Sequence, residues 1–317
     1  MGRYIGKRIL LLIPAVFLVC VIVFALMRMV PGDAVDSIIY KYSSMGISAD
    51  RAEIEAMLGL DKPAVTQFFT WLKGAVTGNL GESLFEYESV SSIIARQLPV
   101  TLELGILTLV FSCLLSIPLG LFCAAKQDSL PDYVFRVISV LLLSIPVFWI
   151  ATMVIIYPAL WFNYAPPTDY VSFLENPLEN LRMFLIPALL GALMQAGIQM
   201  RAVRTMTLEV MRLDYIRTAW AKGTRERVIL FKHAFRNAMI PVVTMIGGSA
   251  ASMIGGSVIM ESVFNIPGIG QQVVVSLGAR DYPVVQGCVL VFAIFVMVVN
   301  LLVDICYKWI DPRITLE

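Results

Sequence analysis

The sequence predicts an all-α integral membrane protein with six transmembrane helices and a helix-turn-helix on its cytoplasmic side. Composition indicates the class, because 58% of the 317 residues are hydrophobic and 15% are charged. Soluble domains average about 45 to 50% apolar and about 25% charged residues. Two further observations support the prediction: a set of long apolar runs, and one strongly basic segment in the C-terminal third. The net charge of +1 implies no nucleic-acid-binding surface.

A transmembrane helix needs about 20 consecutive, mostly apolar residues. Six runs meet this requirement: residues 9–29, 100–125, 133–160, 183–200, 238–260 and 284–306. An even number of spans places both termini on one side of the membrane. Basic residues flank the outer ends of the first and last runs, namely Arg3, Lys7, Arg8, Lys308 and Arg313. Because cytoplasmic loops carry an excess of Lys and Arg, both termini are expected in the cytoplasm.

The first run could be mistaken for a signal peptide, but it is too long and no small-x-small cleavage site precedes Pro31. Residues 1–29 are therefore expected to form a cytoplasmic end and a retained first span. Residues 30–98 then form an extracytoplasmic cap, residues 99–307 a core with the other five spans, and residues 308–317 a cytoplasmic tail. The cap either contacts a solute-binding protein or packs over the external helix ends.

Two helices are predicted inside the cap. Ser48 is a candidate cap for the first one. The second contains Phe68, Phe69, Trp71 and Leu72, and this aromatic content suggests that it lies near the membrane face.

The basic segment lies within residues 204–236. It contains eight basic residues, which are Arg204, Arg212, Arg217, Lys222, Arg225, Arg227, Lys232 and Arg236. The acidic residues among them are Glu209, Asp214 and Glu226. This imbalance predicts a cytoplasmic location.

Local patterns predict two short helices within this segment. Leu208, Met211, Tyr215 and Ala219 recur at helical spacing, and Gly223 is placed to end the helix in a left-handed conformation. Residues 226–235 would form the second helix. Such a projection could fit a groove on a partner, with Ala219 and Gly223 allowing close approach and Arg217 or Lys222 available for carboxylates. An ordinary basic loop held against anionic lipid headgroups is the alternative.

Two motifs in this segment resemble the coupling loop of the dipeptide/oligopeptide/nickel branch of ABC importer permeases. They are Arg217-Thr218-Ala219-x-Ala221-Lys222-Gly223 and His233-Ala234-x-Arg236-Asn237-Ala238-x-x-Pro241. Further matches follow in the family's order: Arg8 to Pro31-Gly32-Asp33, Leu58-Gly59-Leu60-Asp61-Lys62-Pro63, Gly78-Asn79-Leu80-Gly81, Thr101-Leu102-Glu103-Leu104-Gly105, Glu261-x-x-Phe264-x-x-Pro267-Gly268-x-Gly270, Arg280-Asp281-Tyr282-Pro283-Val284-Val285-Gln286-Gly287 and Asn300-Leu301-Leu302-Val303-Asp304. The wider permease consensus has Glu-Ala-Ala where this chain has Arg217-Thr218-Ala219, as is normal for this branch.

The resemblance implies the type I ABC importer permease fold in a bacterial cytoplasmic membrane. It implies three kinds of protein partner besides membrane lipid: a second homologous permease, two ATP-binding-cassette ATPases and an extracytoplasmic solute-binding protein. Coupling to the ATPases would rest on Arg217, Thr218, Ala219, Lys222 and Gly223. Peptides are the first expected substrate, and a nickel chelate is the second.

No catalytic role is expected for this chain. Its sequence contains no Gly-x-x-x-x-Gly-Lys-Ser/Thr motif, so ATP and Mg²⁺ are expected on partner subunits and no cofactor on this one. Its five cysteines lack the paired spacing of zinc or redox sites, and His233 is expected to make a surface contact rather than bind a metal. Two other classes stay open: a secondary transporter, which usually shows inverted repeats and central ionisable residues, and a membrane scaffold.

Polar residues within spans are rare and therefore candidates for function. Glu103, Gln195 and Gln286 are the candidates for the translocation path, each with an interhelical hydrogen bond as its structural alternative. For Gln199 and Asn300 the structural hydrogen bond is preferred, and Asp304 is expected at headgroup depth near Lys308.

Small residues and prolines predict local geometry. Gly248, Ser252 and Gly256 recur every four residues and predict a face for close helix packing. Prolines at 118, 146, 187 and 241 are expected to kink their spans. Pro267-Gly268 predicts a tight external turn with a positive backbone angle at the glycine.

Overall fold

The computed structural model describes residues 2–29, 34–44, 46–48 and 50–310. Within them the regular elements are helices, besides one isolated bridge between Glu82 and Ser89, so the predicted all-α class is confirmed. The predicted motif at Pro31-Gly32-Asp33 and the end of the tail, with Arg313, fall outside the described residues. So do the side chains of Arg3, Lys7, Arg8 and Lys308.

The chain forms two compact units. Unit 1 comprises residues 1–101 and 267–297, and unit 2 comprises residues 102–266 and 298–317. The predicted boundaries at residues 29, 98 and 307 concern position relative to the membrane and stay a prediction.

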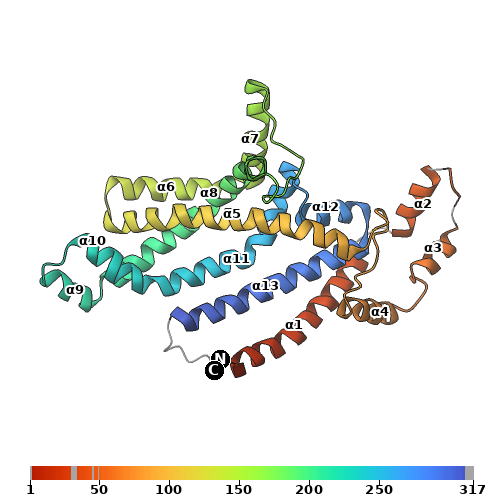
Figure 1. The fold of residues 1–317 in the computed structure, drawn as a ribbon, viewed down its shortest axis with the longest axis horizontal. Helices are drawn as coiled ribbons and strands as arrows, with labels where there is room; N and C mark the ends of the chain where they lie inside the picture. The colour runs from red at the N-terminus through yellow and green to blue at the C-terminus, as the bar shows by residue number, and fades with distance from the viewer. Residues whose placement is uncertain (1, 30–33, 45, 49, 311–317) are drawn as a thin grey trace. The chain divides into compact units, whose positions relative to one another are not determined.

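Unit 1 contains five complete helices and parts of two more (Figure 1). The complete ones are α1 (Gly2–Met29), α2 (Ala34–Ser44), α3 (Arg51–Met57), α4 (Ala64–Val76) and α12 (Ile269–Ala279). The helices α5 (Val90–Ala125) and α13 (Tyr282–Ile310) begin in unit 1 and continue into unit 2.

Unit 2 contains the remaining helices (Figure 1). They are α6 (Leu130–Ser144), α7 (Val147–Phe162), α8 (Pro177–Met211), α9 (Asp214–Ala221), α10 (Glu226–Val228), the π-helix η1 (Ile229–Phe235) and α11 (Arg236–Phe264). Helix α8 packs against α6, α7 and α11, so it is the central helix of this unit.

Five described helices are long and apolar enough to cross a membrane without interruption, namely α1, α5, α8, α11 and α13. The remaining predicted span, the third run at residues 133–160, consists of two helices, since α6 and α7 meet at 90°, and the kink expected at Pro146 is thereby confirmed. Pro146 explains the break: it lacks a backbone N–H, and it favours an extended residue before it. Ile145 has that conformation, with φ −97° and ψ 128°. The other three prolines lie inside continuous helices.

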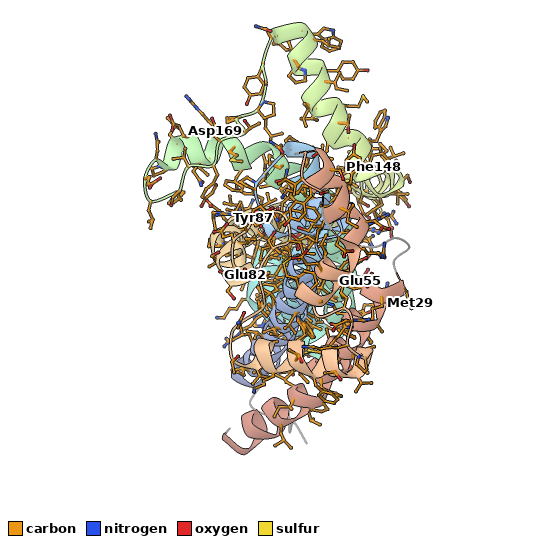
Figure 2. The ribbon with its side chains drawn as sticks, turned by 90° about the vertical axis from the view of Figure 1, so that its right-hand side faces the viewer. Met29, Glu55, Glu82, Tyr87, Phe148 and Asp169 are labelled. Atoms are coloured by element: carbon orange, nitrogen blue, oxygen red, sulfur yellow. The ribbon has the colours of Figure 1, made fainter. Side chains whose placement is uncertain are left out.

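Helix α7 turns away from α6 and leaves much of its surface uncovered within the chain (Figure 1). Ala151 is buried where α7 packs on α8 and α11, whereas Phe148 in its first turn is exposed (Figure 2). The last residues, Trp161 and Phe162, are also exposed. An apolar, aromatic surface of this kind suits contact with lipid or with a neighbouring membrane subunit.

A buried glutamine links three helices of unit 2. Gln199 on α8 accepts a hydrogen bond from Ser116 Oγ on α5 at 2.9 Å and donates one to Ser249 Oγ on α11 at 3.1 Å. This confirms the structural role predicted for Gln199. Each such interhelical bond contributes roughly 0.6 to 2 kcal/mol.

A buried ion pair joins α6 to α8. The Arg204 guanidinium donates two hydrogen bonds of 2.7 Å to the Asp132 carboxylate, which is fully buried and also accepts a bond from Asp128 N. Arg204, which the sequence counts among the eight basic residues of the segment, is therefore paired with an internal partner. The forked geometry of arginine favours this two-point contact with a carboxylate.

Unit 1 holds α4 against α1 through aromatic side chains. The Phe68 ring meets the rings of Phe17 and Phe24 edge to face, with centroids 5.9 and 5.3 Å apart. The predicted aromatic helix of the cap is thus present. The predicted cap at Ser48 is wrong: Asp50 caps α3 by accepting a hydrogen bond from Ala52 N.

Unit 1 also contains a polar network around Asp281 and an apolar cluster of buried residues. Asp281, just before α13, accepts hydrogen bonds from Ser83 Oγ at 2.5 Å and Leu84 N at 3.1 Å. The Gln97 side chain donates to Gln272 Oε1, and Ile93 and Ile269 are buried in the adjoining cluster. Ser83 and Leu84 thereby bind the connection after α4 to the start of α13, and the Gln97–Gln272 bond joins α5 to α12.

The segment before α12 differs from its prediction. Gly268 has φ −101° and ψ 173°, which is extended, and it is the residue that precedes the helix α12. The left-handed residue is Asn265, with φ 53°, at the end of α11. Asparagine tolerates this conformation well enough to end a helix, so the chain reverses two residues earlier than the Pro-Gly pair suggests.

Removing the charge of Asp132 should destabilise unit 2. Asp132→Asn leaves the Arg204 charge buried without a counter-charge, and breaking one side of a buried pair costs about 3 to 5 kcal/mol. We expect a lower unfolding midpoint in detergent, measured by size-exclusion thermostability. Asp128→Asn, an exposed neighbour, is the matched control. Replacing both partners, as Asp132→Leu with Arg204→Met, should recover part of the loss; no recovery would contradict the ion-pair explanation.

Stability should depend on pH through Asp281. Burial raises the pKa of its carboxyl above the usual 3.8, against the opposing effect of hydrogen bonds from Ser83 and the backbone. The native state therefore holds this proton at pH values where the unfolded state has lost it, so stability falls as pH rises from that usual value through the folded one. Asp281→Asn removes this decline while keeping an acceptor oxygen. Unfolding midpoints of both proteins from pH 4 to pH 7 measure the difference; identical slopes would refute it.

Candidate functional site: the basic helical projection

The basic helical projection consists of residues 213–235 and lies at the C-terminal end of α8 (Figure 1). Its first helix, α9, begins after Leu213, and Asp214 in the first turn suits the positive end of the helix dipole. Ile216 is fully buried, whereas Arg217 and Thr218 are exposed. The helix therefore rests on one apolar residue and presents its polar face outward.

Gly223 ends this part of the projection as predicted. Its φ is +73°, and its N–H donates to Trp220 O at 2.9 Å while Thr224 N–H donates to Ala219 O at 3.2 Å. These two bonds satisfy carbonyls at the helix end and form a Schellman motif. A Cβ added at Gly223 would meet no atom within 4 Å, so backbone conformation, not crowding, favours glycine here.

The second half differs from the separate short helix predicted for residues 226–235. One α-helical turn, α10, passes into the π-helix η1, which continues without a break into α11. Ile229 and Ala234 are fully buried, and η1 contacts both α8 and α9. Because the backbone is continuous, a displacement of η1 acts directly on α11. Sequence periodicity gave no sign of the π-helix; such segments are rare and often occur at functional sites.

Asn237 joins the two halves of the projection. Its amide donates hydrogen bonds to Tyr215 Oη at 2.7 Å and to His233 O at 2.8 Å. The motif that contains Asn237 suggested the family but not this contact. The bond fixes α9 against the start of α11, so the projection is a connected unit rather than a loose loop.

The outer surface of the projection is basic and partly aromatic. Seven of the eight predicted basic residues are exposed: Arg212 and Arg236 flank the projection, and the five within it are Arg217, Lys222, Arg225, Arg227 and Lys232. The Arg217–Asp214 pair is 3.4 Å long, with side chains 75% and 95% exposed, so it holds Arg217 only weakly. Trp220 and Phe231 are also exposed, at 44% and 58%. Cations beside exposed aromatic rings are typical of protein interfaces.

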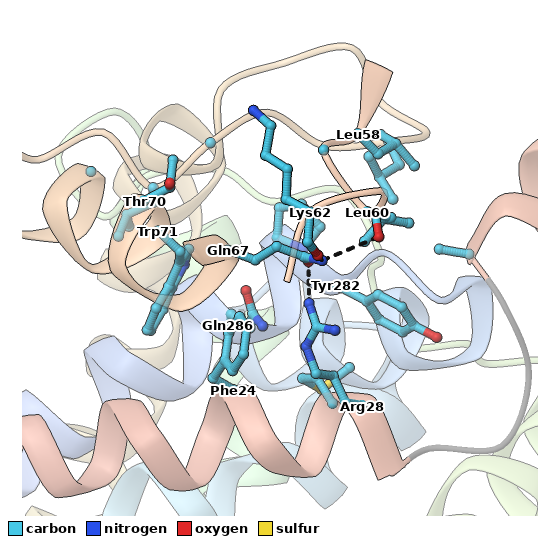
Figure 3. Close-up of a pocket in the computed structure, with 18 of the residues that line it drawn as sticks. Phe24, Arg28, Leu58, Leu60, Lys62, Gln67, Thr70, Trp71, Tyr282 and Gln286 are labelled. Atoms are coloured by element: carbon cyan, nitrogen blue, oxygen red, sulfur yellow. Dashed lines mark hydrogen bonds between the residues drawn. The ribbon is translucent and has the colours of Figure 1, made fainter. Parts of the chain in front are cut away.

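The predicted path residues lie in different surroundings. Glu103 on α5 is half-buried, and its Oε2 accepts a hydrogen bond from Tyr170 Oη at 3.3 Å. Gln195 is half-buried on α8. Gln286 belongs to unit 1, where it is largely buried and lines a cavity (Figure 3). Glu103 and Gln195 thus share unit 2, and Gln286 does not.

The predicted small-residue face is open in this chain. Gly248, Ser252 and Gly256 are exposed, and no atom would lie within 4 Å of a Cβ at either glycine. Packing of this face therefore stays a prediction that concerns another subunit. The close internal approach on α11 is made by Gly247, which faces the Val303 side chain.

Two family descriptions match the chain. Residues 116–316 match the binding-protein-dependent transport system inner membrane component, and residues 1–105 match the N-terminal part of such membrane components. The chain therefore belongs to the family of inner membrane components of binding-protein-dependent transport systems.

Relatives match the chain over almost its full length. A putative peptide transport system permease protein of Brucella suis is 39% identical over 315 residues, covering 99% of both chains. The dipeptide transport system permease proteins DppB of Escherichia coli and Alkalihalophilus pseudofirmus are 36% and 33% identical, again with 99% of both chains covered.

Membership confirms the resemblance inferred from the sequence motifs. The chain is a multi-pass inner membrane permease of an ABC importer, and proteins of this family work with a solute-binding protein and an ATPase.

Gly223→Ala should impair the projection without unfolding the chain. Alanine at positive φ costs about 1 kcal/mol relative to glycine, which weakens the motif that ends α9. We expect reduced ATP-driven uptake in proteoliposomes with unchanged expression. Gly223→Asn is the control, because asparagine accepts left-handed geometry, and it should retain more activity than alanine. An equal loss in both variants would show that the side chain, not the backbone angle, matters.

Proposed function

We propose that this chain imports di- or oligopeptides as the permease subunit of its transporter. The observation that carries the proposal is the agreement of the relatives over 99% of both chains, each named as a peptide or dipeptide permease. A nickel chelate, the second expected substrate, gains no support from these names.

The transporter is proposed to contain a second homologous permease, two ATPases and one extracytoplasmic binding protein. ATP and Mg²⁺ belong to the ATPases, and this chain performs no catalysis of its own. Both termini and the basic helical projection lie in the cytoplasm, in keeping with the exposed cations on residues 213–235.

Coupling runs through the projection. Arg217, Thr218 and Lys222 offer hydrogen-bond donors to an ATPase groove, while Ala219 and Gly223 permit close approach. When the ATPase groove moves, it displaces α9 and η1. This displacement reaches α8, on which both helices pack, and α11, with which η1 is continuous. The Gln199 bridge joins α8 and α11 to α5, so the three helices respond together. Their joint reorientation changes the side of the membrane to which the substrate path opens.

Glu103 and Gln195 are proposed to line the substrate path. A carboxylate attracts the ammonium group of a peptide, and Glu103 is positioned by Tyr170 within reach of the connection between α7 and α8. The burial of Gln286 in unit 1 favours a structural role for that residue instead.

Charge reversal on the projection tests the function. The complete transporter is purified from its native membrane, and ATPase activity and uptake of a labelled dipeptide are measured in proteoliposomes with the binding protein present. We expect two ATPases to co-purify with the wild type. Arg217→Glu with Gly223→Asp should release the ATPases or uncouple hydrolysis from uptake.

Lys73→Glu serves as the matched control, because it reverses an exposed charge on α4 of the cap and should leave coupling intact. Uptake by this chain alone, driven by a proton or sodium gradient, would favour a secondary transporter. Purification of the chain with other proteins and no uptake would favour a scaffold. Either result would overturn the proposal.

A further inference from the structure

Unit 1 contains a cavity that the transport cycle proposed above does not use. Its volume is about 590 Å³, within the range of roughly 300 to 1,000 Å³ common for small-molecule sites. Its walls come from the last turns of α1, from the cap between α3 and α5, and from the start of α13 (Figure 3).

Two cationic side chains line the cavity; Figure 3 shows Arg28 directed toward Gln67 and the Lys62 side chain extending away from Arg28. Arg28 and Lys62 line it, and none of its described lining residues is Asp or Glu. Both cations are exposed, so they can reach a ligand at the mouth. The Trp71 Nε1–H is shielded from solvent and has no hydrogen-bond partner among the described residues. A buried donor without a partner is costly, and rotation of the indole would let this N–H donate to a ligand oxygen in the cavity that Trp71 lines.

The arrangement around Arg28 is held in place before any ligand arrives. Arg28 lies over the Phe24 ring at 4.6 Å and donates to Gln67 Oε1. The Gln67 amide in turn donates to Lys62 O at 2.7 Å and Leu60 O at 3.3 Å (Figure 3). This hydrogen bond orients the guanidinium, and arginine has five N–H donors, so others can meet a ligand as far as the described residues show.

The position of the cavity points to a lipid. Helix α1 is a candidate span, and Arg28 lies in its last turn, so a bilayer crossed by α1 would have its headgroups near Arg28. Below Arg28 the helix exposes apolar side chains, including Val21, Ile22 and Leu26. An anionic head at Arg28 would therefore have its acyl chains beside an apolar helix surface. Phosphate groups and aromatic side chains commonly share this level of a membrane.

We propose that this cavity binds the glycerophosphate head of an anionic phospholipid, with Arg28 and Lys62 on the phosphate and Trp71 donating to a glycerol or ester oxygen. The inference rests on the membrane orientation proposed above, which assigns the lipid to the outer leaflet. It adds a specific lipid site to the subunit, anchoring the cap to α1.

The test uses the complete purified transporter and palmitoyl-oleoyl phosphatidylglycerol. Lipid retained after detergent washing is counted by native mass spectrometry. Basic residues near an anionic membrane contribute about 1 kcal/mol each, so Arg28→Gln with Lys62→Gln should weaken retention by about 30-fold. Trp71→Phe keeps a ring but loses the N–H, and it should weaken retention by roughly fivefold.

Lys73→Gln is the matched control, because Lys73 lies on α4 but does not line the cavity, and it should retain the lipid like the wild type. Equal retention by all variants, or equal retention of phosphatidylcholine, would overturn the proposal. Displacement by millimolar inorganic phosphate would assign the cavity to a soluble anion and also overturn it. Dipeptide uptake is measured on the same samples. Lipid retention without dipeptide uptake would contradict the proposed function and leave the lipid site supported.

Discussion

Polar groups inside a membrane protein must find partners within the protein, because lipid offers none. In unit 2 this constraint is met around α8. Gln199 joins it to α5 and α11, and Arg204 joins it to Asp132 at the start of α6. Apolar contacts between helices gain little in lipid, so such polar links and close contacts carry much of the specificity. Helix α8 can therefore act as the common support for its neighbours.

This support gives the basic helical projection its mechanical importance. The projection is connected to α8 by a short turn at Leu213, and to α11 by the continuous helix through η1. The Asn237–Tyr215 bond and the Schellman motif at Gly223 limit internal movement. A force applied to Arg217 or Lys222 would consequently move helices rather than bend a loop. Exposed cations and aromatic rings on the outer face provide the contact surface.

Local patterns predicted several features well. The end of α9 at Gly223 follows from the left-handed angle that glycine accepts, and the aromatic helix α4 follows from its apolar spacing. The predicted structural role of Gln199 rested on the cost of a lone amide in lipid, and the structure supplies its two partners. The kink expected at Pro146 is confirmed, but hydropathy does not measure its size, and the 90° break divides residues 133–160 into two helices. The turn predicted at Gly268 failed because Asn265 takes the positive angle first.

The sequence by itself determined the membrane class, the permease family, the basic projection and the apolar lengths of five uninterrupted spans. Each of these depends on composition or on residues close together in the chain. The tertiary structure decided that Arg204 is neutralised by Asp132, 72 residues away, and that Gly247 rather than Gly248 makes the close internal contact. It also brought Arg28, Lys62 and Trp71 to one cavity. Such pairings depend on how distant helices pack, and neither hydropathy nor local turn chemistry contains that information.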